Sequence, residues 1–147
     1  MGDRRRGREL ALQILFQIDL GKEEKPLTLE DCKKDFLENQ DENPEIKDFA
    51  YQLAKGTLEN LEKIDTLIKD RLKNWDFSRI ASVDRNIIRS AVYELVFCDE
   101  IPVAVTINEA IEIAKDYSGK ESSKFVNGIL DKIKKDKDII KRDNGGK

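Results

Sequence analysis

The sequence contains no histidine, which removes the commonest general base and the Ser-His and Cys-His arrangements of nucleophilic catalysis. Its two cysteines, Cys32 and Cys98, stand alone, and without histidine they do not make a zinc site. A disulfide between them stays open, although nothing in the sequence indicates an oxidising compartment. Neither glycine-rich nucleotide motif, GxGxxG or GxxxxGK followed by Ser or Thr, occurs. Carboxylates and lysines could still do acid–base work, but no constellation of them stands out; we expect no metal and no cofactor.

Long apolar stretches are also missing. No run approaches the roughly 18 residues of a membrane-spanning helix, and the N-terminus lacks the apolar segment of a secretory signal. We expect a cytoplasmic protein with no membrane association. At 147 residues the chain is most simply one domain, long enough to bury a core without disulfides or metals. Its charged fraction of 39 % agrees with a thermophilic source, where surface ion pairs are favoured.

Positive charge is concentrated at the two ends of an acidic chain. The first ten residues carry a net charge of +2 and residues 131–147 carry +3; the whole chain carries −3, which leaves −8 for the 120 residues between them. The N-terminal excess comes from the arginine cluster Arg4, Arg5, Arg6 and Arg8. Such a distribution favours a polyanionic ligand. A solubilising, frayed N-terminus is the alternative explanation.

The spacing of apolar residues predicts an all-α fold, a compact helical bundle of about seven helices in residues 1–138. We expect residues 139–147 to form a charged, frayed tail. The expected helices begin near Arg4, Thr28, Pro44, Leu61, Ser82, Thr106 and Ser122 or Ser123. The helix from Thr28 should end near Asn39, and a short turn is expected at 75–80. The helix from Ser82 is the most apolar and should be central. Thr28, Asn43 and Ser82 are expected N-caps, and Thr106 with Glu109 has the spacing of a capping box.

A second candidate site is the segment 123–128, with the sequence SKFVNG. Lysine offers a charge, phenylalanine a stacking surface and asparagine a hydrogen-bonding amide, which together suit single-stranded RNA. At the start of a helix they would also lie beside free N–H groups that favour phosphate. The alternative is structural, with Phe125 in the core and Gly128 allowing close packing.

Arg85 and Arg89 lie four residues apart near the start of the helix expected from Ser82. If they are exposed, they form ion pairs worth about 0–1 kcal/mol each. The functional alternative is a polar edge for a protein partner.

Five sequence segments, in order, cover nearly the whole chain. They are RRRGRELALQILF at 4–16, VDRNIIR at 83–89, YEL at 93–95, INEA at 107–110 and KFVNGIL at 124–130. In this order they resemble the NusB family of bacterial transcription antitermination factors. The resemblance implies an all-helical fold of two packed subdomains and no catalysis. It also implies pairing with NusE, a small-subunit ribosomal protein. The pair would bind single-stranded boxA RNA, notably in ribosomal RNA leaders, and help RNA polymerase in its antitermination complex to read through termination signals.

The resemblance also implies site residues, by motif position. The RNA-binding residues would be Arg4, Arg5, Arg6, Arg8, Lys124, Phe125 and Asn127. Glu121 would tune affinity, because an acid near phosphate weakens binding. Phe16 and Asp84 would bind the partner protein. Gly7 departs from the family pattern, where alanine is commoner, and should loosen the helix start. We expect the two basic segments to converge into one site.

Two other functions stay open. A NusB-like domain also precedes the catalytic domain of certain RNA cytosine methyltransferases, so the chain could be an RNA-binding accessory domain. It could also be a helical scaffold that binds proteins alone, in which case the arginines would be dispensable. A homodimer that covers the basic site is a further alternative.

Overall fold

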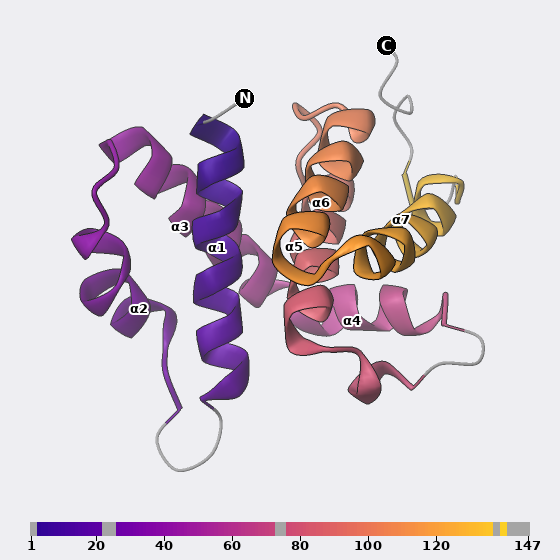
Figure 1. Cartoon of the computed structure of the whole chain (residues 1–147), viewed down its shortest axis with the longest axis horizontal. Coiled ribbons are helices and arrows are strands. Elements are labelled where there is room, and N and C mark those ends of the chain that lie inside the picture. The colour runs from indigo at the N-terminus through magenta and orange to yellow at the C-terminus, as the bar shows by residue number, and fades with distance from the viewer. Residues whose placement is uncertain (1–2, 22–25, 73–75, 137–138, 141–147) are drawn as a thin grey trace. The chain divides into compact units, whose positions relative to one another are not determined.

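The computed structural model describes residues 3–21, 26–72, 76–136 and 139–140. Within these residues the chain forms seven α-helices, two single-turn 3₁₀ helices and no strand (Figure 1), which confirms the all-α prediction. The chain divides into two compact units, Met1–Glu59 and Asn60–Lys147. None of the described helices combines the length and apolar character needed to cross a membrane.

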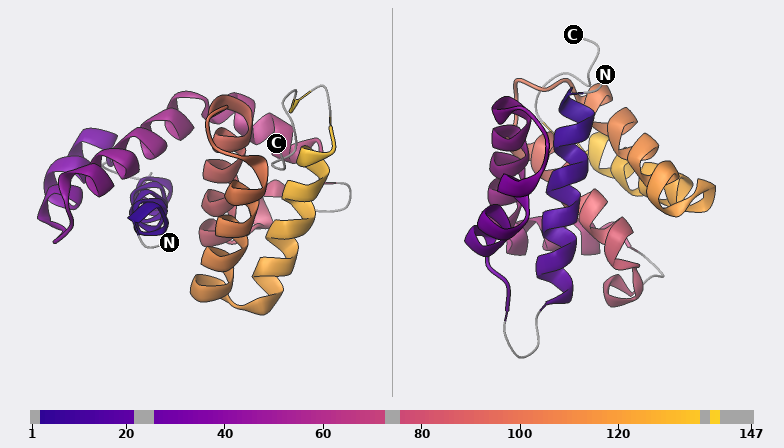
Figure 2. Two further views of the ribbon diagram at one scale, coloured as in Figure 1. Left: turned by 90° about the horizontal axis from the view of Figure 1, so that it is seen from above. Right: turned by 60° about the vertical axis from the view of Figure 1, so that its left-hand side comes forward.

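Unit 1 is built on two long helices that pack along each other. Its elements are α1 (Asp3–Leu20), α2 (Leu29–Asp35), a 3₁₀ helix (Leu37–Asn39) and α3 (Pro44–Glu59). Both views of Figure 2 show α1 beside α3. Leu10, Ala11 and Ile14 are fully buried, as their three- and four-residue spacing on α1 predicts.

Side chains cap the starts of α2 and α3 as the sequence predicts. The Thr28 hydroxyl accepts a hydrogen bond from the Asp31 amide at 3.1 Å, and the Asp31 carboxylate accepts one from the Thr28 amide at 3.0 Å. Asn43 Oδ1 accepts from the Ile46 amide at 2.9 Å. The helix expected to run from Thr28 to Asn39 is interrupted, because α2 ends at Asp35 and a 3₁₀ turn follows.

Unit 2 is organised around α5. Its elements are α4 (Leu61–Lys69), a 3₁₀ helix (Phe77–Arg79), α5 (Ser82–Phe97), α6 (Val103–Ser118) and α7 (Lys120–Lys134). Helix α5 contacts α4, α6 and α7, and α6 lies beside α7 in Figure 2. Ile88, Val92 and Leu95 are completely buried. This confirms the prediction that the apolar helix from Ser82 is central, here within unit 2.

The predicted caps of α5 and α6 are wrong. Helix α5 begins at Ser82 itself, with Ala81 at the capping position. Helix α6 begins at Val103, one turn before Thr106. The Thr106 hydroxyl does not cap a helix; it donates to Oε1 of the buried Glu94 at 2.8 Å. A buried carboxylate needs a donor, and that need outweighs the local capping pattern.

The predicted start of α7 is also wrong. Helix α7 begins at Lys120, ahead of Ser122 and Ser123. Gly119 has a φ of 107°, a left-handed conformation that glycine adopts without strain, and its amide closes α6 on the Ala114 and Lys115 carbonyls. One glycine thus ends one helix and allows the next to begin at once.

Parts of two expected segments lie outside the described residues. Trp75, in the turn expected at 75–80, is one, and residues 141–147 of the expected tail are the others. Within the described part of the tail, Ile140 is buried and its amide donates to the Asp136 carbonyl at 2.9 Å.

Candidate nucleic-acid interface

The four arginines of α1 have different environments. Arg4 is exposed, Arg5 and Arg6 are half-buried, and Arg8 is buried with 7 % of its surface exposed. The sequence correctly places the cluster on one helix, but the helix turns its members in different directions. Arg4 is therefore the arginine most open to a ligand.

Arg6 is held by an acidic segment that precedes α3. Its Nε donates to Glu42 Oε2 at 2.8 Å, and its two Nη atoms contact Glu9 Oε1 at 3.3 Å and Gln40 Oε1 at 3.5 Å. The hydrogen bond to Glu42 is the main reason that the pKa of Arg6 is raised above its usual value. Sequence reasoning missed Glu42, because it lies 36 residues from Arg6.

Arg4 and Arg8 share a contact with Phe49 of α3. The guanidinium carbon of Arg4 lies 4.3 Å from the centre of the Phe49 ring, and that of Arg8 lies 5.5 Å away. Phe49 is half-buried. No sequence signal links it to the arginines.

The second basic segment lies on α7. Lys124, Asn127 and Gly128 are exposed and Phe125 is half-buried; Glu121, one turn before Phe125, is also exposed. The structural alternative for Gly128 is wrong, since no described residue outside its own helix turn lies within 4 Å of where its Cβ would be. The expected help from free helix N–H groups is wrong too. Because α7 begins at Lys120, the residues 124–127 lie beyond its first turn.

The two residues expected to bind the partner protein, Phe16 and Asp84, lie in different units. Phe16 is half-buried on α1. Asp84 lies in the first turn of α5, where the helix dipole favours a negative charge, and only 8 % of its surface is exposed. Its Oδ2 accepts from the Ser122 hydroxyl at 2.9 Å, which links α5 to the start of α7. Its Oδ1 is buried and has no hydrogen-bond donor among the described residues.

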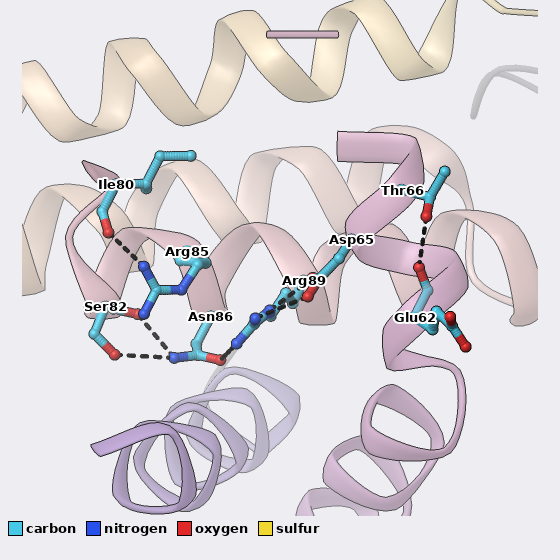
Figure 3. Close-up of polar contacts among 8 residues, drawn as sticks. All are labelled: Glu62, Asp65, Thr66, Ile80, Ser82, Arg85, Asn86 and Arg89. Atoms are coloured by element: carbon cyan, nitrogen blue, oxygen red, sulfur yellow. Dashed lines mark hydrogen bonds and ion pairs between the residues drawn. The ribbon is translucent and has the colours of Figure 1, made fainter. Parts of the chain in front are cut away.

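Next to Asp84, a network of polar side chains holds the start of α5 (Figure 3). Arg89 donates from Nε and Nη2 to the two carboxylate oxygens of Asp65 at 2.8 and 2.9 Å, and from Nη1 to Asn86 Oδ1 at 3.0 Å. Asn86 in turn donates to the Ser82 carbonyl at 2.9 Å, and Arg85 donates to the Ile80 carbonyl at 2.7 Å. The ion pair expected for Arg89 is present, but it is not an exposed pair, because the Arg89 side chain is 6 % exposed.

The two basic segments belong to separate units, on α1 and α7. Their convergence into one site stays a prediction. Each of them presents an exposed cation on a helix surface, Arg4 in one case and Lys124 in the other. An exposed cation on each segment can bind an anionic group.

The fold and the exposed cations on α1 and α7 place the chain in a class of all-α proteins that present basic helix surfaces. Residues 5–135 match the NusB family, and the chain belongs to that family. A curated relative from Pelotomaculum thermopropionicum, named transcription antitermination protein NusB, is 47 % identical over 130 residues, which cover 88 % of each chain.

Solved structures agree with this assignment. NusB of T. maritima is 40 % identical with a TM-score of 0.78, covering 96 % of this chain and 92 % of that one. A crystal structure of antitermination factors NusB and NusE in complex with dsRNA contains a chain that is 28 % identical, with a TM-score of 0.77 and coverage of 90 % and 96 %.

Proposed function

We propose that this chain is an RNA-binding transcription antitermination factor that acts without catalysis. With a NusE-type ribosomal protein it would bind single-stranded boxA RNA, notably from ribosomal RNA operons, and help RNA polymerase to read through termination signals in the cytoplasm. The observation that carries the proposal is the family match over residues 5–135, together with a relative of the same fold solved with NusE and dsRNA.

The surface of α1 supports a role in phosphate binding. A cluster of arginines at a helix N-terminus opposes the helix dipole by some tenths of a kcal/mol, so it does not serve helix stability. Arg4 is exposed and Arg5 half-buried, so both can reach a ligand. Arg6 would have to exchange Glu42 for phosphate, and Arg8 is buried. In our proposal Arg4 and Arg5 make the main electrostatic contribution.

The surface of α7 supports recognition of bases. Lys124 and Asn127 are exposed one helical turn apart, and Phe125 beside them is half-buried. A ring can stack on a base and an amide can bond to its edge, whereas Glu121 would repel phosphate and so limit affinity.

For the partner protein we propose contacts near Phe16 and Asp84. Phe16 is half-buried and offers apolar surface. Oδ1 of Asp84 has no donor within the described part of the chain, and a buried acceptor without a donor costs about 1–3 kcal/mol. A donor supplied by the partner would remove that cost.

The accessory-domain alternative is less favoured. The curated relative from Pelotomaculum thermopropionicum is itself a transcription antitermination protein, and the match covers 88 % of its length. A scaffold that binds proteins alone remains the competing function, and RNA binding distinguishes the two.

The decisive experiment measures binding of the purified protein to three RNAs: a single-stranded boxA-type RNA, a scrambled single strand, and a duplex of the boxA sequence. Each is tested with and without the NusE-type partner. We expect preference for the boxA single strand, strengthened by the partner. Equal weak binding to all three RNAs with no partner effect would refute the proposal.

A second prediction concerns the acid that holds Arg6. Glu42→Gln should tighten RNA binding by about two- to fivefold, because a partly exposed ion pair contributes up to about 1 kcal/mol that RNA must otherwise replace. Glu38→Gln is the matched control. It removes the same charge from the neighbouring 3₁₀ helix, where Glu38 is exposed and contacts Lys47 only through its backbone carbonyl. Equal affinities for the two variants would show that Glu42 does not compete with RNA.

A further inference from the structure

The ring of Phe49 lies directly against the backbone of α1, between the arginine side chains. An ideal Cβ at Gly7 would lie 2.5 Å from Cδ2 of Phe49 and 3.3 Å from Cε2, so a side chain at position 7 would collide with the ring. The absence of a side chain at Gly7 therefore makes room for Phe49. The sequence interpretation of Gly7 as a residue that only loosens the helix start is incomplete.

This placement brings the ring to Arg4 and Arg8 at once. The two guanidinium carbons lie 4.3 and 5.5 Å from the ring centre, within the range of a cation–π contact. Arg4 and Arg8 are four residues apart on one helix face, where two like charges repel each other. The electron-rich face of the ring attracts both cations and so offsets that repulsion.

We propose that Phe49 is a positioning residue for RNA binding: seated on Gly7, it holds Arg4 in an ordered, outward position before RNA arrives. This inference rests on the proposed function, since it assigns a role to arginines that bind phosphate. A free arginine samples many rotamers and loses that freedom when it binds. An arginine already ordered on a ring loses less, so the gain in affinity comes from preorganisation. Arg8 is buried at the same ring and acts as part of the support.

The test compares Phe49→Leu, which keeps apolar bulk but removes the ring, with Phe49→Tyr, which keeps the ring. The control is Phe97→Leu on α5, which removes a ring that is 38 % exposed and also contacts a cation, Lys63, at 5.3 Å. We expect Phe49→Leu to weaken binding of the single-stranded boxA-type RNA by about two- to fivefold. Phe49→Tyr and Phe97→Leu should bind as the parent chain does. In an Arg4→Gln background, Phe49→Leu should have no further effect.

A second readout needs no RNA. Aromatic ring currents shift the NMR signals of Arg4 side-chain protons in the free protein, and Phe49→Leu should abolish that shift and increase the mobility of the Arg4 guanidinium. Unshifted, mobile Arg4 signals in the parent chain would overturn the positioning role even if RNA binds.

The outcomes separate the two proposals. If Arg4→Gln weakens RNA binding but Phe49→Leu does not, the positioning role is wrong and the proposed function stands. If the parent chain binds no RNA, with the partner or without it, the proposed function fails and the role of Phe49 in RNA binding fails with it, whatever the NMR signals show. A loss of affinity for Phe49→Leu that persists in the Arg4→Gln background would assign Phe49 a general structural role and overturn the inference.

Discussion

Asp65→Ala should lower the free energy of unfolding by about 3–5 kcal/mol, the cost of leaving a buried charge without its partner. Arg89 is 6 % exposed in its side chain and donates hydrogen bonds to both carboxylate oxygens of Asp65. In the variant, the guanidinium keeps Asn86 Oδ1 as a hydrogen-bond acceptor but loses the negative charge of Asp65. Urea titration followed by circular dichroism measures the change, and amide exchange should show it first in α4 and α5, the two helices that the pair joins.

Asp131→Ala is the matched control for this prediction. Asp131 pairs with Lys134 at 3.7 Å and Lys135 at 3.0 Å on α7, with a side chain that is 39 % exposed. Exposed pairs of this kind contribute about 0–1 kcal/mol. If Asp65→Ala and Asp131→Ala cost the same, the buried network of Figure 3 does not stabilise the fold as its geometry indicates.

The number and type of the helices could be predicted from the sequence because apolar spacing reflects burial on one helix face. The sequence predicts a helix start correctly where the side chain at the cap hydrogen-bonds to the backbone of its own helix, as at Thr28 and Asn43. Thr106 has the same local pattern but serves Glu94, twelve residues away in the chain. A local motif cannot reveal that competing partner, and so the start of α6 was placed a turn too late.

The candidate site was predictable as a set of residues but not as a surface. The arginine cluster is visible in the sequence, yet its division into an exposed Arg4, an ion-paired Arg6 and a buried Arg8 depends on α3 and the segment before it. Those contacts join residues more than thirty positions apart, so no periodicity encodes them. Gly7 is the clearest case, because its structural role depends on the ring of Phe49, which lies 42 positions further along the chain.

The different environments of the arginines predict that Arg4 and Arg5 have a large effect on RNA binding. Replacing Arg4 and Arg5 together by glutamine should weaken binding by on the order of tenfold or more at moderate salt, because each lost phosphate contact removes counterion release. The plot of log affinity against log salt should become shallower by about 1.4, since each contact to a single strand contributes about 0.7. Fluorescence anisotropy over a salt series measures both quantities. Arg8 is left unchanged, because its burial would mix a loss of folding with a loss of binding.

The control removes two positive charges at the C-terminal end of α7, by Lys134→Gln together with Lys135→Gln in the residue that follows the helix. Both lysines already pair with Asp131, so they release few counterions to RNA. An equal loss for the two double variants would mean that net charge attracts RNA without a defined site.

If replacing Arg4 and Arg5 leaves both RNA affinity and its salt dependence unchanged, the arginine cluster does not bind phosphate. The chain would then be better explained as a scaffold for proteins, which should retain its partner without these arginines. If RNA is lost while partner binding persists, the arginines have a role that a scaffold does not need.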